Sequence, residues 1–186
     1  MTPREIERLK SRIADIKRIF AVEKLSYGRY PDKSGVRYLP TKYYVQLGDY
    51  TSGLTYLKWF SKNFPVDPGL PYFFFEWIII LYKKGNIRNA EKKAFETYRS
   101  NTYLFDTFFN RSIIAIDKWE DSNLAKPAFA KNLGYSCEQI ELADFSEWLS
   151  NYYFSEKFNK LSNSFIAIQK RIKLDNDKET PLHVQL

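Results

Sequence analysis

Two segments of this chain share one pattern at an offset of 37 residues, measured from Gly48 to Gly85. They are residues 43–50 (YYVQLGDY) and residues 80–87 (ILYKKGNI). Each has an apolar, aromatic-rich run, a turn of glycine plus a polar residue, and then a second amphipathic run. A helix–turn–helix unit that recurs at about 34 residues is typical of helical arrays. The sequence therefore predicts two antiparallel helical hairpins that stack on one another.

The first residues carry strong signals for the start of a helix. Thr2 can cap the helix, Pro3 suits its first position, and Glu5 stands where a capping box needs an acid. Apolar residues then recur at spacings of three and four, which places them on one stripe. The stripe consists of Ile6, Leu9, Ile13, Ile16 and Phe20. We expect this helix to end near Val22.

The remaining elements follow from the apolar periodicity and from the turn residues between the runs. Apart from a loop at 26–35, we expect helices at about 40–47, 49–63, 71–84, 86–99 and 102–119, a further helix that begins at 143, and a last long one from 155 to about 175. Pro127 and Gly134 make the stretch 121–140 irregular or short-helical. The segment 71–84 is apolar almost all round, which predicts a helix packed on both sides.

We therefore predict an all-α fold in one domain, residues 1–186. Its antiparallel hairpins would stack as a short right-handed α-solenoid with capping helices at both ends. The expected parts are an N-terminal helix (1–24), a first repeat (38–66), a second repeat (70–101), a degenerate third repeat (102–140), C-terminal helices (141–175) and a flexible tail (176–186).

Residues 38–102 resemble tetratricopeptide (TPR) repeats. The run 43–50 is similar to the middle of such a repeat, and Pro65 stands where the family commonly has a proline. In the second unit Gly85, Asn86 and Ala90 match the pattern. Gly53 departs from it, because the family usually has alanine there. The resemblance implies a TPR-like protein without catalytic activity, which binds a partner protein or peptide.

The resemblance also implies where the partner would bind. TPR arrays usually bind extended peptides along a face built from the first helix of each pair. By position, the partner-binding residues would be Tyr38, Lys42, Gln46, Tyr72, Glu76, Ile79 and Lys83, and Asn110 would be comparable in the third unit. Lys42 and Lys83 would anchor an acidic group.

Two other functions stay open at this point. The chain has a formal net charge of +7, and residues 1–30 carry eight Lys and Arg against four Asp and Glu. A basic RNA- or DNA-binding protein would use this surplus together with Lys83, Lys84, Arg88, Lys92 and Lys93. The general composition, rich in Lys, Asn, Tyr and Phe, also suits a bacterial immunity protein that neutralises a toxin.

The sequence offers little for catalysis or for cofactors. There is one cysteine, Cys137, and one histidine, His183, so zinc chemistry and a disulfide framework are excluded by residue count. The acidic residues Asp117, Glu120 and Asp121 fit a solvated turn better than a cation site. We expect no enzyme activity, no cofactor and no metal.

The same features bear on location. A lone cysteine suits a reducing compartment, and residues 1–20 are charged throughout and give no signal peptide. The most apolar run, 70–82, is shorter than the roughly 20 residues that a membrane span needs. We expect a cytoplasmic protein. Its terminal helices would either cap the array or pair with a second copy in a homodimer, and we favour caps.

Overall fold

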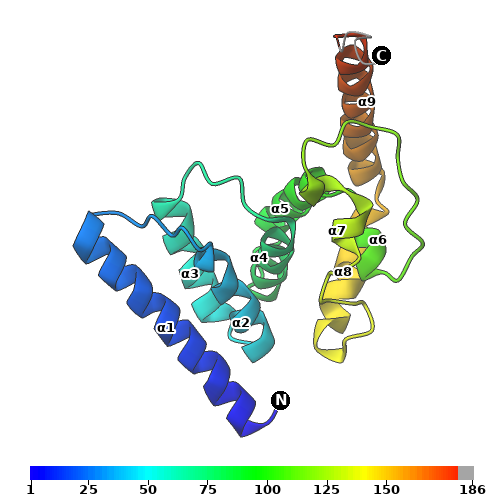
Figure 1. Ribbon diagram of the computed structural model, residues 1–186. Helices are drawn as coiled ribbons and strands as arrows, with labels where there is room; N and C mark the ends of the chain where they lie inside the picture. Colours follow the sequence, from blue (N-terminus) through cyan, green and yellow to red (C-terminus); the bar gives the residue numbers. More distant parts are fainter. Residues whose placement is uncertain (180–186) are drawn as a thin grey trace. The chain divides into compact units, whose positions relative to one another are not determined.

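The computed structural model of the protein describes residues 1–179, and within that range it is all-helical, as predicted (Figure 1). No strand occurs among these residues. The α-helices are α1 (Pro3–Tyr27), α2 (Leu39–Leu47), α3 (Tyr50–Asn63), α4 (Pro71–Lys83), α5 (Ile87–Ser100), α6 (Leu104–Phe108), α7 (Pro127–Ala130), α8 (Ala143–Tyr153) and α9 (Glu156–Glu179). Short 3₁₀ turns stand at Val36–Tyr38 (η1), Asn123–Ala125 (η2) and Ile140–Leu142 (η3).

The start of α1 confirms the predicted capping box. The Glu5 amide donates to Thr2 Oγ1 at 3.3 Å, and the Thr2 amide donates to Glu5 Oε2 at 2.7 Å. The helix runs a little further than predicted and ends at Tyr27, where Gly28 adopts a left-handed conformation with φ of 65°. A glycine in that conformation lets its own amide bond back to the Lys24 carbonyl, which closes the last turn.

The chain divides into two compact units, the first from Met1 to Ala94 and the second from Phe95 onward. In the first unit α2 is the shared element, because it contacts α1, α3 and α4, and α3 also contacts α4. The expected hairpin boundaries are confirmed: α2 ends at Gly48, and the Asp49 side chain caps α3 through a 3.0 Å bond from the Ser52 amide.

At Gly53, helix α3 lies close to both α2 and α4. A Cβ atom built there would lie 3.0 Å from Ile80 Cδ1 on α4 and 3.3 Å from Tyr44 Cβ on α2. Such contacts are tighter than most real side chains make. The absence of a side chain at this position therefore lets α3 settle against both neighbours.

The predicted helix 102–119 is wrong beyond its first turns. α6 ends at Phe108, and Asn110 has a left-handed backbone with φ of 53°. The Arg111 amide then donates to the Asp106 carbonyl at 2.8 Å, a bond that terminates the helix. Residues 111–117 have no regular structure. The isoleucines in that stretch, which read as a helical stripe, belong to an extended segment.

The rest of the second unit follows the prediction more closely. Residues 121–140 hold only short helical turns, and α8 and α9 start where expected. Side chains from α8 and α9 meet α5 and α6 in an aromatic cluster, where the Phe158 ring centroid lies 5.2 Å from those of Tyr98 and Tyr153. Of the predicted tail, 176–179 belongs to α9, and the remainder with His183 lies outside the described residues.

Candidate binding surfaces of the first unit

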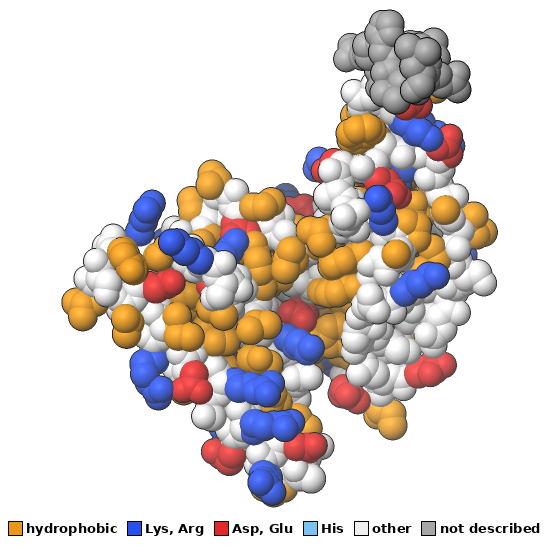
Figure 2. Space-filling view, viewed as in Figure 1, with side chains coloured by type: hydrophobic (Ala, Val, Ile, Leu, Met, Phe, Trp, Pro, Cys, Tyr) orange, Lys and Arg blue, Asp and Glu red, His pale blue; other side chains and the backbone are white. Residues whose placement is uncertain are grey.

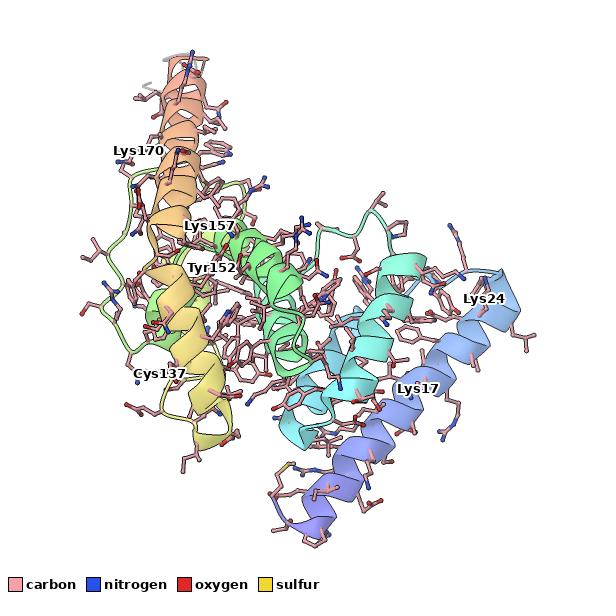
Figure 3. All side chains as sticks on the ribbon, turned by 180° about the vertical axis from the view of Figure 1, so that it is seen from behind. Lys17, Lys24, Cys137, Tyr152, Lys157 and Lys170 are labelled. Atoms are coloured by element: carbon pink, nitrogen blue, oxygen red, sulfur yellow. The ribbon has the colours of Figure 1, made fainter. Side chains whose placement is uncertain are left out.

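A recess of about 460 Å³ lies between α1 and α3 in the first unit. Its ten lining residues are Lys17, Phe20, Ala21, Tyr30, Tyr44, Thr51, Ser52, Thr55, Tyr56 and Trp59. Seen from behind, α1 and α3 lie side by side with aromatic side chains between them, and Lys17 stands midway along α1 (Figure 3). This volume is within the range of small-molecule sites in proteins, roughly 300–1,000 Å³.

One end of the recess is aromatic. The Trp59 ring lies 5.0 Å from the rings of both Phe20 and Tyr30, and 5.4 Å from that of Tyr56, measured between centroids. Phe20 is 4% exposed, so it forms part of the floor. Rings at these distances pack against one another. The parts of their surfaces that line the recess can contact an apolar ligand.

The other end is polar, because it is built from the first turns of α3. Thr51 Oγ1 accepts a 3.0 Å hydrogen bond from Lys84 Nζ, so its own proton stays available. The Ser52 hydroxyl bonds to Asp49, which lowers the pKa of that carboxyl, and Lys17 lowers it further. Lys17 lines the recess about one turn of α1 before Phe20, whose ring contacts Trp59 at the aromatic end.

Two tyrosines in the recess differ in how their hydroxyls are used. The Tyr56 hydroxyl donates to the Arg37 carbonyl at 2.6 Å, and burial raises its pKa well above the ordinary value. Tyr44 is 4% exposed, yet its hydroxyl makes no hydrogen bond with any residue that the structure describes. A tyrosine hydroxyl without a protein partner can bond to a ligand or to a water molecule in the recess.

The loop beside the recess is fixed by Arg37. Its guanidinium donates to Asp32 Oδ2 at 2.8 Å and to Asp67 Oδ2 at 2.6 Å. Although burial lowers the pKa of Arg37, these hydrogen bonds raise it overall. Asp32 also accepts the amides of Val36 and Arg37 at 3.0 Å each. The segment that carries Tyr30 is therefore tied to the loop between α3 and α4.

The seven predicted partner-binding residues lie at different depths. Lys42 and Gln46 are exposed on α2, four residues apart and hence on one face of the helix. Tyr38, Tyr72 and Lys83 are half-buried. The Tyr38 hydroxyl donates to Asp67 Oδ1 at 2.5 Å, so it takes part in the hydrogen bonds that hold the loops together. Whether any of these residues binds a partner stays a prediction.

Two of the seven lie in the interior of the first unit. Glu76 is 4% exposed and Ile79 is fully buried. The Thr41 hydroxyl donates to Glu76 Oε2 at 2.5 Å, which makes this carboxylate an internal link between α2 and α4. The positions were assigned from the repeat pattern, whereas the apolar character of 71–84 had already indicated a helix that is packed on both sides.

The terminal helices also differ from each other. The α1 stripe is almost entirely used within the first unit: Leu9, Ile13, Ile16 and Phe20 are buried, and α1 contacts α2. On α9 Phe158 is buried, whereas Ile168 is 58% exposed and Ile172 is 37% exposed. A homodimer through the terminal helices stays a prediction, and both helices expose apolar side chains for it, Val22 and Leu25 on α1 as well as those on α9.

The basic residues predicted for nucleic-acid binding make several contacts inside the first unit. The Lys93 ammonium lies 4.0 Å from the centre of the Trp77 ring, and Lys83 lies 5.8 Å from that of Tyr50. Figure 2 shows the visible face of this unit as a mixture of hydrophobic side chains with Lys and Arg, interrupted by acids.

No group of three or more His, Cys, Asp or Glu side chains gathers to hold a metal ion within residues 1–179. In the same range no helix is long and apolar enough to cross a membrane. Cys137 is half-buried, and its amide donates to the Phe108 carbonyl at 2.8 Å.

Comparison of the chain with protein-family models, with curated proteins and with solved structures found no match.

Proposed function

We propose that this protein is a non-catalytic interaction module of the helical-repeat type, which binds a partner protein or peptide through the first-helix face of its repeats. The main support for the proposal is the pattern of buried and exposed side chains on α2. Three helices contact it and bury Thr41, Tyr43, Tyr44 and Val45, while Lys42 and Gln46 stay exposed. A rigid helix with one uncovered polar face is a suitable platform for recognition.

The packing of α2, α3 and α4 supports this proposal. In stacked hairpins the first helix of one pair contacts both its own partner and the first helix of the next pair. Here α2 contacts α3 and α4, and α3 contacts α4. A short TPR-like right-handed solenoid is the arrangement that we infer from these contacts and from the repeat pattern.

The exposed chemistry of α2 favours an acidic partner. Within the described residues Lys42 makes no ion pair and Gln46 makes no side-chain hydrogen bond. An ammonium and an amide on one helical face offer donors for a carboxylate and for a peptide group. Lys83, at the end of α4, adds a second cation to the first unit.

The experiment is affinity capture from the native host, followed by mass spectrometry. The variant Lys42→Glu/Lys83→Glu reverses both charges, and Lys58→Glu/Lys62→Glu makes the same change of charge on exposed residues of α3. We expect one stoichiometric protein with the wild type and with the α3 variant, and its loss with the first variant. Equal recovery with both variants would rule out this face.

A further inference from the structure

We propose that the recess between α1 and α3 is a binding site for small aromatic or alkyl carboxylates, a role independent of the partner surface on α2. The carboxylate would lie at the end that holds Lys17 and Thr51, and the apolar part would lie among Phe20, Tyr30 and Trp59. The size of the recess, about 460 Å³, suits a small molecule.

The two ends of the recess explain why the ligand is amphipathic. Phe20, Tyr30 and Trp59 are mutually in contact, with ring centroids 5.0–5.8 Å apart, and they offer apolar surface. The opposite end has the Thr51 hydroxyl and the Lys17 ammonium. A ligand with an apolar body and a polar head matches this division, whereas a purely apolar one leaves the polar end unused.

The charged residues around the recess favour an anionic ligand over a cationic one. None of the ten lining residues is acidic, and Lys17 is the one cation among them. Lys84 adds positive charge behind Thr51, at 3.0 Å from its oxygen. The nearby carboxylate, Asp49, is already engaged: it accepts from the Ser52 amide at 3.0 Å and caps α3. A cationic guest would meet the two positive charges of Lys17 and Lys84 against the single carboxylate of Asp49.

Tyr44 supplies an independent indication of a ligand. The residue is 96% buried, since only 4% of it is exposed, and it lines the recess. Its hydroxyl has no hydrogen-bond partner among the described residues, while that of neighbouring Tyr56 is satisfied by the Arg37 carbonyl. The Tyr44 hydroxyl can therefore donate to a carboxylate oxygen that enters the recess.

Isothermal titration calorimetry with 4-phenylbutyrate, its neutral amide and 4-phenylbutylamine tests the proposal. These probes share one apolar body and differ in charge. We expect the carboxylate to bind about fivefold more tightly than the amide, since one partly exposed ion pair contributes up to roughly 1 kcal/mol. The amine should bind least. Equal affinity for carboxylate and amide, preference for the amine, or no binding of any probe would overturn the proposal.

Variants localise the binding. Lys17→Gln should remove the preference for the carboxylate, whereas Lys58→Gln, on an exposed part of α3 outside the recess, should keep it. Ala21→Trp should fill the recess and weaken binding at least tenfold. Ala14→Trp, on an exposed part of α1 away from the recess, is the matched control. If Ala21→Trp binds the carboxylate as well as Ala14→Trp does, the probe is elsewhere and the proposal is wrong.

Discussion

Arg37 Nε donates to Asp67 Oδ2 at 2.6 Å, across 30 residues of sequence. The same guanidinium also pairs with Asp32, whose side chain is fully buried. One arginine thus joins the loop after α1 to the loop before α4. Because one wall of the recess, Tyr30, stands in the first of these loops, the ion pair helps to shape the candidate site.

Asp67→Ala should destabilise the first unit by about 2–4 kcal/mol, because the half-buried guanidinium loses one of its two carboxylates. Urea unfolding measures this cost. Asp15→Ala is the control, since it removes the exposed pair between Asp15 and Arg18, in which both side chains are more than half exposed. That change should cost well under about 1 kcal/mol. Equal costs for the two variants would contradict the structural role given to Asp67.

Gly53→Val should destabilise the protein by about 1–3 kcal/mol, because the added atoms enter a place where even a Cβ would lie 3.0 Å from Ile80. Lys58→Val is the control on an exposed turn of the same helix, where helix propensity alone costs about 0.5 kcal/mol. Thermal unfolding of both variants gives the comparison. A Gly53→Val variant as stable as the control would mean that α3 is not held closely against α4.

Asn110 should tolerate glycine and resist a β-branched residue. Its φ of 53° is left-handed, a conformation that glycine adopts freely and that costs most other residues about 1–2 kcal/mol. Denaturant unfolding of Asn110→Gly and Asn110→Val should therefore show no loss in the first and a loss of that size in the second. Similar stability of the two would indicate that the chain continues as a helix past Phe108.

Alkaline pH should unfold the protein through its buried tyrosines. Burial, and then a hydrogen bond to Asp67, raise the pKa of Tyr38 to about 12, and burial raises that of Tyr98 to about 12, both from 10.0. Between pH 10 and 12 the unfolded chain loses these protons and the folded chain keeps them. Stability is therefore full below pH 10 and falls as the pH rises towards 12.

Circular dichroism and tyrosinate absorbance, followed together from pH 9 to 12, check this expectation. Exposed tyrosines should contribute part of the absorbance without helix loss, and the remaining part should appear together with helix loss. If all of the tyrosines ionise while the helical signal is unchanged, the hydroxyls are not buried as described.

Local patterns were enough to predict most helices. The capping box at Thr2 and Glu5, the glycine at the end of α2 and the cap at Asp49 each act within a few residues, so the sequence displays them directly. The helix over 102–119 was predicted wrongly because isoleucines at helical spacing look the same in an extended segment. Asn110, which takes a left-handed backbone, was the one local sign of the break.

The candidate sites depend on tertiary contacts, and these were harder to predict. Nothing in the repeat pattern distinguishes buried Glu76 from exposed Lys42, since the difference is made by which helix covers each position. The recess was missed altogether, because its walls come from α1, the following loop, α2 and α3. Its one visible sign in the sequence was the number of aromatic residues, which suits an ordinary hydrophobic core equally well.

Lysine footprinting with an amine-reactive reagent, read by mass spectrometry with and without the captured partner, tests the binding role of α2 most directly. Lys42 on α2 and Lys58 on α3 are both exposed, so both should react in the free protein. We predict that the partner protects Lys42 and leaves Lys58 reactive. Unchanged labelling of Lys42, with protection of lysines on another helix, would contradict the proposed interaction face.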